Sequence, residues 1–335
     1  MTLASSLAIL ALITNAYGAT YNPVFCGDTV VPLTTHKIMG GVDAKPDQFP
    51  NAVAIFRNDH YICSGSLIAP GIIITAAHCF MDRKKQPYLD IVCGDDKECI
   101  QKYLGIGYFN KCKMGFYDIE NIKETVTVLI GGLPLDSDVK RLPVIDVDPS
   151  YVRFFHRGCV QHDIAILKVE DTGNARYSCV SSRINVRNLV NAMAIGWGGD
   201  AIKDLTTHNK LQLLDSNIVH PRDECIHKTS GDFPVDGICI DEFQDRNSCS
   251  GDSGGPLLAY QDFQRYKHRL VTLGVLSFGS NCKLLRENKA PGGAVYTRLD
   301  FYHNMINTVL GLDGFYDDLS FTADVVNHTL EKATE

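Results

Sequence analysis

Short apolar runs separated by Gly, Pro, Asn and Asp recur along the chain after residue 50. Many of these runs are rich in Val, Ile and Thr, and several alternate between apolar and polar positions; they cover residues 52–56, 71–76, 124–130, 163–169, 192–197, 211–219 and 270–278. Alternation with a period of two is typical of strands that bury one face. Many short strands with turns between them predict an all-β barrel or sandwich.

One segment, residues 300–312, has helical spacing instead. Phe301, Met305 and Val309 recur four residues apart, which places them on one face of a helix. Asp300 is a suitable N-cap for this helix and Gly311 a suitable stop. The polar and acidic residues 313–335 that follow are expected to form a flexible tail.

The N-terminus has the pattern of a secretory signal peptide. An apolar run over residues 3–13 is followed by the small residues of Ala16-Tyr17-Gly18, which predicts cleavage before Ala19. The run is too short to span a bilayer. We therefore expect a secreted, extracellular protein that does not act at a membrane.

Composition adds two constraints to this picture. The 335 residues are 45% hydrophobic and 21% charged with a net charge of −7, which is ordinary for a globular protein and argues against nucleic acid as a partner. The chain contains 12 cysteines. Behind a signal peptide, an even number of cysteines predicts disulfides rather than metal or redox chemistry.

The strongest chemical signal is a six-residue motif, Gly251-Asp252-Ser253-Gly254-Gly255-Pro256. A serine hydroxyl becomes an effective nucleophile when a base takes its proton and donors stabilise the oxyanion that forms. Glycines let the backbone turn so tightly that adjacent N–H groups can point at one spot. A surface turn has a similar composition, but a chance match to all six residues is on the order of one in 10⁴ to 10⁵.

Two further residues could complete a nucleophilic site. His78 follows the apolar residues 72–74 and precedes Cys79, and a histidine held at a strand end can act as general base. Asp163 opens the apolar run 163–169, where a carboxylate needs a partner such as an imidazole N–H. Taken singly, each of these residues is more often structural.

Together, the three segments resemble the chymotrypsin/trypsin family of serine peptidases, in which His, Asp and Ser follow in this chain order. The resemblance extends from about residue 38 to residue 312 and implies two packed antiparallel Greek-key β-barrels with a C-terminal helix. It implies that Ser253 is the nucleophile, His78 the general base and Asp163 the residue that orients the imidazole. The N–H groups of Gly251 and Ser253 would form the oxyanion hole, and no cofactor or metal is implied.

The resemblance also implies that the protein is made as a zymogen. Ile38-Met39-Gly40-Gly41 is similar to the family's activation sequence, with Lys37 as the cleavage point. The new amine of Ile38 would then pair with Asp252, and a buried ion pair that forms only after cleavage is a two-state switch.

Four disulfides are implied in the same way. They are Cys26–Cys179, which would keep the propeptide attached, Cys63–Cys79, Cys225–Cys239 and Cys249–Cys282. The remaining cysteines allow three pairings between which the sequence does not decide; they are Cys93, Cys99, Cys112 and Cys159.

Those four cysteines mark the main departure from the family. We expect a disulfide-rich insertion over about residues 88–158. Asp95, Asp96 and Glu98 within it could bind calcium, but their spacing fits no known ligand loop, so a solvated hairpin is favoured.

Substrate preference depends in this family on the residue six positions before the nucleophile, here Asn247. A neutral amide does not offset the desolvation of a buried cation, which predicts an uncharged residue before the scissile bond and a separate trypsin-like protease as activator. The resemblance places Ser277, Phe278 and Gly279 on the strand that pairs with substrate, and Ala294 on a pocket wall.

The predicted organisation is thus a signal peptide (1–18), a propeptide (19–37), a peptidase domain (38–312) and a tail (313–335). We expect a monomeric endopeptidase whose partners are protein or peptide substrates, its activator and protein inhibitors, with a glycosylation sequon at Asn327. One alternative is a secreted binding or regulatory protein that kept the fold and lost turnover. Another is a lectin-like or structural β-protein, which would not explain the three motifs together.

Overall fold

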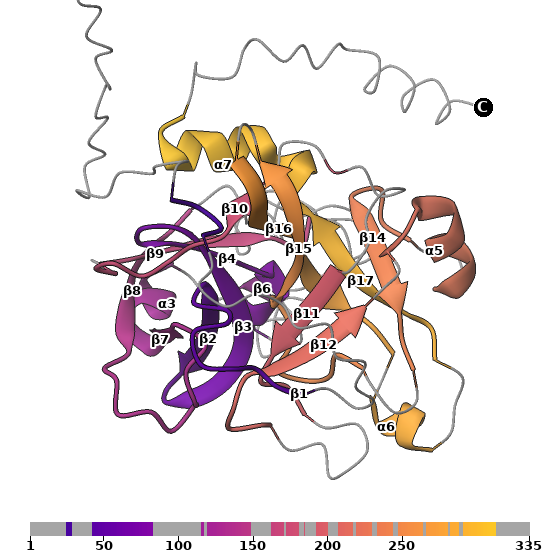
Figure 1. The fold of residues 1–335 in the computed structure, drawn as a ribbon. Coiled ribbons are helices and arrows are strands. Elements are labelled where there is room, and N and C mark those ends of the chain that lie inside the picture. The colour runs from indigo at the N-terminus through magenta and orange to yellow at the C-terminus, as the bar shows by residue number, and fades with distance from the viewer. Residues whose placement is uncertain are drawn as a thin grey trace, which may run out of the picture.

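The computed structural model describes most of the predicted peptidase domain (Figure 1). The described residues are 25–28, 42–82, 115–116, 119–148, 162–170, 172–180, 184, 192–199, 207–216, 219–229, 233–243, 247–263, 266–280, 282–287 and 291–312. Several predictions lie outside these residues and stay predictions: the signal peptide, the activation site at Lys37 and Ile38, the tail with Asn327, and the sites at Cys93, Asp95, Asp96, Glu98, Cys99, Cys112 and Cys159.

Six strands close a first barrel in the order β2-β3-β4-β9-β8-β7, and every pairing between them is antiparallel. The strands are β2 (Ala52–Arg57), β3 (His60–Ala69), β4 (Ile72–Thr75), β7 (Val126–Ile130), β8 (Leu142–Val147) and β9 (Ala165–Val169). Closure pairs the edge strands with each other, so the barrel has no open edge.

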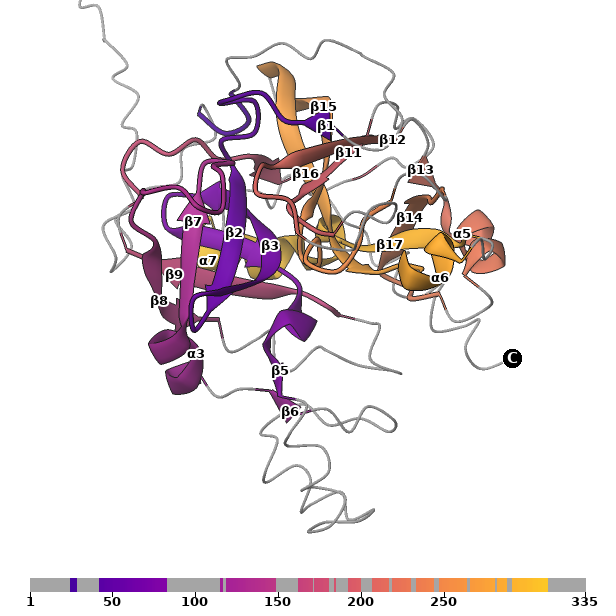
Figure 2. The same ribbon diagram turned by 90° about the horizontal axis from the view of Figure 1, so that it is seen from below.

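A second, nine-stranded sheet has the order β1-β12-β11-β15-β16-β17-β14-β13, with β10 paired in parallel to β16. Its strands are β1 (Val42–Asp43), β10 (Cys179–Val180), β11 (Ala192–Gly196), β12 (Gln212–Ser216), β13 (Val219–His220), β14 (Gly237–Asp241), β15 (Pro256–Phe263), β16 (Tyr266–Phe278) and β17 (Gly293–Arg298). It is a half-barrel rather than a closed barrel in the described part of the chain. The barrel and this sheet lie side by side in both views (Figures 1 and 2).

The shorter elements within the described residues are a strand pair and six helical segments. They are β5 (Met81–Asp82) with β6 (Gly115–Phe116), the 3₁₀ segments η1 (Ala77–Phe80) and η3 (Leu299–Tyr302), and the helices α3 (Ile119–Thr125), α5 (Arg222–Lys228), α6 (Cys282–Arg286) and α7 (His303–Leu310). None of the helices among the described residues is both long and apolar enough to cross a membrane. The mostly β fold with a short C-terminal helix confirms the predicted fold class.

One hydrophobic core is shared by the barrel and the sheet. Val53 and Leu67 of the barrel belong to the same buried cluster as Leu257 and Val271 of the sheet, and all four are 0% exposed. Because the core is continuous, the two halves form one packed unit in which residues far apart in sequence hold fixed positions.

The C-terminal helix differs from the prediction at its start. The chain first forms η3, and α7 begins at His303 without a side-chain cap. Asp300 is therefore not the N-cap: its carboxylate accepts hydrogen bonds from Arg298 Nη2 at 2.6 Å and from the backbone N–H of Ile184 at 3.1 Å. Gly311 ends the helix as expected, with a left-handed φ of 70°.

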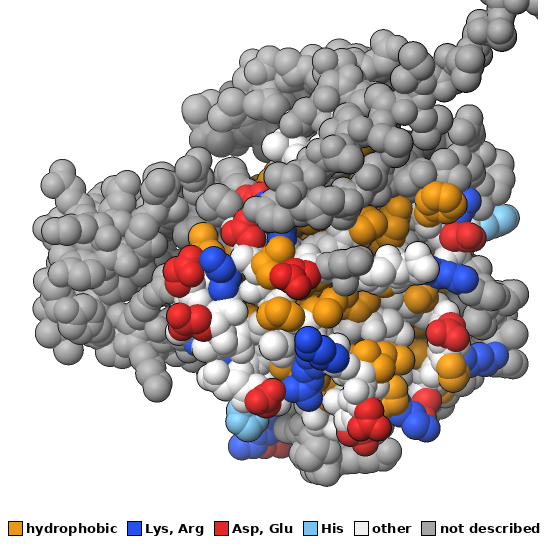
Figure 3. All heavy atoms as spheres, turned by 90° about the vertical axis from the view of Figure 1, so that its left-hand side faces the viewer, with side chains coloured by type: hydrophobic (Ala, Val, Ile, Leu, Met, Phe, Trp, Pro, Cys, Tyr) orange, Lys and Arg blue, Asp and Glu red, His pale blue; other side chains and the backbone are white. Residues whose placement is uncertain are grey.

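Part of the expected insertion belongs to the barrel. Strands β7 and β8 lie between residues 88 and 158 and complete the closure, so only the remainder of that range is additional to the barrel. The flank of the molecule on this side carries hydrophobic side chains interspersed with charged ones (Figure 3). A groove of about 670 Å³ on the barrel is lined by residues such as Ile130, Leu133, Lys140 and Arg176 and by none of the predicted site residues.

Candidate active site

His78 and Asp163 are joined by two hydrogen bonds. His78 lies in η1, which directly follows the buried strand β4, and Asp163 lies two residues before β9, the neighbour of β4. The carboxylate accepts the backbone N–H of His78 at 2.9 Å and lies 2.7 Å from ring Nδ1. Because a carboxylate binds the protonated Nδ1, the other ring nitrogen, Nε2, is left as the basic one.

Asp163 accepts a third hydrogen bond, which comes from the second sheet. The hydroxyl of Ser277, at the end of β16, donates to Asp163 Oδ2 at 2.6 Å. The Asp163 side chain is only 1% exposed, whereas His78 is 21% exposed. Three donors therefore hold a buried carboxylate in place, and the imidazole that it orients is accessible to solvent.

The loop that carries Ser253 packs against the barrel strands next to His78. The carbonyl of Ser253 accepts the N–H of Ser64 in β3 at 2.8 Å, and the N–H of Gly254 donates to Leu276 at 2.8 Å. Gly254 has a φ of 74°, and a Cβ there would collide with the Thr75 side chain. A residue with a side chain does not fit this turn, which explains the glycine after the serine.

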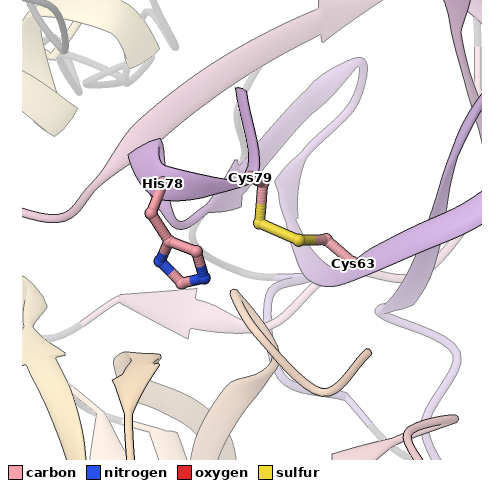
Figure 4. Close-up of side chains that lie close together, drawn as sticks. All are labelled: Cys63, His78 and Cys79. Carbon is pink, nitrogen blue, oxygen red and sulfur yellow. A yellow bond between two sulfur atoms is a disulfide. The ribbon is translucent and has the colours of Figure 1, made fainter. Parts of the chain in front are cut away.

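The disulfide between Cys63 and Cys79 lies beside the histidine (Figure 4). Cys79 Sγ is 3.9 Å from the carbonyl oxygen of Ser253, so the bridge connects the surroundings of the histidine and the serine. The two sulfurs and a His78 ring nitrogen lie within 4.8 Å of one another. This group does not fit a metal, because a disulfide offers no thiolate ligand.

The backbone at Gly251 is fixed by two hydroxyl groups from β3. Its carbonyl accepts hydrogen bonds from Tyr61 Oη at 2.6 Å and from Ser64 Oγ at 3.2 Å. Burial raises the pKa of the Tyr61 hydroxyl far above its usual value, so the group remains a donor. Gly251 has a φ of 101°, and a Cβ there would lie 2.9 Å from the Tyr61 ring.

The buried carboxylate of Asp252 is bound by backbone N–H groups. Its carboxylate accepts the N–H of Gly198 at 2.7 Å and that of Cys249 at 2.8 Å. A Cβ at Gly196 or Gly198 would collide with the carboxylate, which explains the glycines on either side of Trp197. Burial raises the pKa of Asp252 to about 6, although the two N–H donors act against this.

Four disulfides join the described cysteines, and their pairings are those implied by the resemblance: Cys26–Cys179, Cys63–Cys79, Cys225–Cys239 and Cys249–Cys282. The first spans 153 residues and connects the segment before the predicted cleavage point to the second sheet. A propeptide held in this way would remain attached after cleavage.

The predicted pocket residues lie at the ends of β16 and β17 and in the loop before Ser253. Phe278 is in register with Val295 of β17, next to the buried Ala294. The Asn247 amide binds the backbone of its own loop, with Oδ1 accepting the Phe243 N–H at 2.7 Å and Nδ2 donating to the Phe243 carbonyl. Asn247 is expected at the base of the pocket, and its side chain carries no charge.

Sequence reasoning missed three features of the site. It placed Ser277 on the substrate-pairing strand and did not foresee its bond to Asp163, and it did not single out Tyr61. It also passed over Glu242, a buried acid that is 4% exposed. Glu242 lies only five residues before Asn247, and this closeness to a predicted pocket residue was the one sequence signal that could have directed attention to it.

Comparisons with known proteins show which family the chain resembles. A family model described as Trypsin matches residues 38–104 and 120–306. Brachyurin from Leptuca pugilator is 26% identical over 280 residues, covering 82% of this chain and 99% of that protein. The trypsin-like protease try-5 of Caenorhabditis elegans is 26% identical over 318 residues, with 88% of each chain covered. Urokinase-type plasminogen activator of Gallus gallus is 26% identical over 290 residues, and the match spans 81% of this chain and 57% of that protein.

Proposed function

Because the chain belongs to the trypsin family and is a serine-type endopeptidase, we propose that it cleaves proteins with His78, Asp163 and Ser253 as its catalytic triad. The observation that carries this proposal is the pair of bonds from His78 to the buried Asp163 carboxylate, next to the Ser253 loop. An oriented base beside a serine is the arrangement that nucleophilic acyl transfer requires.

In this mechanism Ser253 Oγ attacks the scissile carbonyl while His78 Nε2 takes its proton. Asp163 stabilises the imidazolium that forms. The N–H groups of Gly251 and Ser253 bind the oxyanion, and the Tyr61 hydroxyl fixes this backbone by donating a hydrogen bond to the Gly251 carbonyl. His78 then protonates the leaving amine, and water resolves the acyl-enzyme by the reverse sequence.

Activation by cleavage after Lys37 is the second part of the proposal. The new ammonium of Ile38 would approach Asp252, whose pKa is raised to about 6 by burial and whose contacts are neutral N–H groups. A cation beside this carboxylate would offset the cost of its desolvation. Because Asp252 directly precedes Ser253, cleavage at Lys37 would in this way affect the position of the nucleophile.

Asn247 is expected at the base of the pocket, and its neutral amide supports a preference for an uncharged substrate residue before the scissile bond. On that basis a separate trypsin-like protease would cut at Lys37. Ser277, Phe278 and Gly279 would pair with the substrate backbone at the end of β16, and Ala294 would make the pocket shallower.

We further propose secretion, since the signal-peptide pattern and the four disulfides both fit an oxidising compartment. Modification of Asn327, a monomeric state and control by protein inhibitors belong to the same proposal. A binding or regulatory protein without turnover is less well supported, because all three triad residues are present.

The test is limited trypsin treatment of the purified precursor, followed by N-terminal sequencing and a peptide-library assay, with Ser253→Ala as control. We expect a new N-terminus at Ile38, and cleavage of library peptides that disappears in the control. A protein that is cut at Lys37 and yet cleaves no peptide would instead be a binding protein.

A further inference from the structure

Glu242 follows β14 and is almost completely buried, at 4% exposure. Both of its oxygens accept the N–H of Ser280, at 2.9 and 3.1 Å, and the Ser280 hydroxyl in turn accepts the N–H of Gly292 at 2.9 Å. Ser280 follows β16, and Gly292 precedes β17. The carboxylate therefore lies between the ends of the two strands that carry the predicted pocket residues.

The Glu242 carboxylate lies on the side of β16 toward which a side chain at Gly279 would point. A Cβ built on Gly279 would collide with Glu242 Oε1 and lie 3.5 Å from the Cα of Ala294. Gly279 is expected on the strand that pairs with the substrate, and Ala294 is expected on a wall of the pocket. The space that a side chain at Gly279 would fill is thus occupied by a carboxylate from another loop.

The partners that the structure gives this carboxylate are neutral. The Ser280 N–H donates to it, and the Ser280 hydroxyl and the Gly292 N–H, which are bonded to each other beside it, are neutral as well. Burial raises the pKa of Glu242 above its usual value, and only these donors act against it. The neighbouring acid differs, since Asp241 forms ion pairs with Lys228 at 2.6 Å and with His220 at 2.9 Å.

We propose that Glu242 determines the charge preference of the substrate pocket, and that its carboxylate binds the cationic side chain of a Lys or Arg before the scissile bond. A poorly hydrated carboxylate attracts an ammonium or guanidinium more strongly than a solvated one does. The proposal rests on the peptidase activity proposed above. It revises the preference expected from Asn247 by adding Lys and Arg to the uncharged residues.

The test is the Glu242→Gln variant, activated by trypsin and compared with the parent on matched peptides that carry Lys, Arg, Gln, Leu or Phe before the scissile bond. A hydrogen-bonded charge pair is worth roughly ten- to a hundredfold in kcat/KM. We expect Glu242→Gln to lose about that factor on Lys and Arg peptides and to keep its activity on uncharged ones. Glu242→Asp keeps the charge and should retain part of the preference for Lys and Arg.

Asp241→Asn is the matched control, because it removes one negative charge from the adjacent position outside the pocket. A profile that changes equally in both variants would overturn the proposal, as would a parent enzyme that cuts uncharged peptides but not Lys or Arg. If Glu242→Gln instead gains activity on large uncharged residues alone, the carboxylate merely fills the pocket. Failure to cut any peptide would refute the peptidase proposal itself.

The precursor offers a second readout. A pocket that accepts Lys would also accept Lys37, so the parent precursor should slowly process itself at that bond. Glu242→Gln should slow self-processing by a similar factor, without affecting cleavage at Lys37 by added trypsin. Equal self-processing in the two precursors would contradict the proposal.

Discussion

The buried carboxylate of Asp252 makes a quantitative prediction for the uncleaved chain. Its pKa is raised from 3.8 to about 6 because burial disfavours the charged form. A group whose pKa is higher in the folded state favours folding at low pH, and this contribution is lost as the pH rises through the folded-state pKa. We therefore expect Asp252 to destabilise the precursor as the pH rises from below 4 to above 6.

The size of the effect follows from the shift. A shift of roughly two pKa units corresponds to about 3 kcal/mol in the free energy of unfolding. About 2 kcal/mol of this should develop between roughly pH 4.5 and 7.5, because an unfolded carboxyl is already largely ionised at the lower limit.

The assay is urea unfolding followed by the fluorescence of Trp197, the only tryptophan, which is 1% exposed. It lies between Gly196 and Gly198, the two glycines next to the Asp252 carboxylate. The precursor should carry Ser253→Ala to prevent self-cleavage, and the comparison is with the same chain carrying Asp252→Asn. The difference in unfolding free energy between the two chains should change by about 2 kcal/mol over that pH range. An unchanged difference would refute the argument that this carboxylate is desolvated and uncompensated before activation.

Three other changes test the construction of the site. Ser277→Ala removes a donor to the buried carboxylate of the proposed triad, so kcat should fall by about ten- to a hundredfold with little change in KM; an unchanged kcat in steady-state assays would show that the bond does not matter. Replacing Cys63 and Cys79 together with Ala opens a disulfide between residues 16 apart and should cost about 3 kcal/mol in urea unfolding; full stability would contradict this. Gly254→Ala forces a side chain into a backbone with a φ of 74° and should cost about 2–5 kcal/mol, and a variant as stable as the parent by the same measurement would show that the turn can relax.

Much of the fold could be predicted from the alternation of apolar and polar residues along the chain, because strands with one buried face leave this pattern. The run predicted at 192–197 is β11 (Ala192–Gly196), and that at 270–278 lies within β16. Strand β3 was missed because Ser64 and Ser66 interrupt its apolar positions. Both serines are at most 1% exposed, and Ser66 bonds to Ser178 and Thr272 across the core; such polar networks leave no trace in the alternation.

In the site, too, short motifs could be read from the sequence, whereas contacts between residues far apart in the chain could not. The motifs around His78, Asp163 and Ser253 are local, so the sequence displays them. The bond from Ser277 to Asp163 joins residues 114 apart, and that from Tyr61 to Gly251 joins residues 190 apart. The position of Glu242 likewise depends on how β14, β16 and β17 pack, which no single segment encodes.

The central claim is that His78 activates Ser253, and covalent labelling tests it most directly. After cleavage at Lys37, the protein is treated with a serine-directed fluorophosphonate, and the modified residue is identified by peptide mass spectrometry. We predict one label per chain, on Ser253, at a rate that falls by about 10⁴-fold in His78→Ala. Labelling of a different residue, or an equal rate on Ser253 without the imidazole, would contradict the claim.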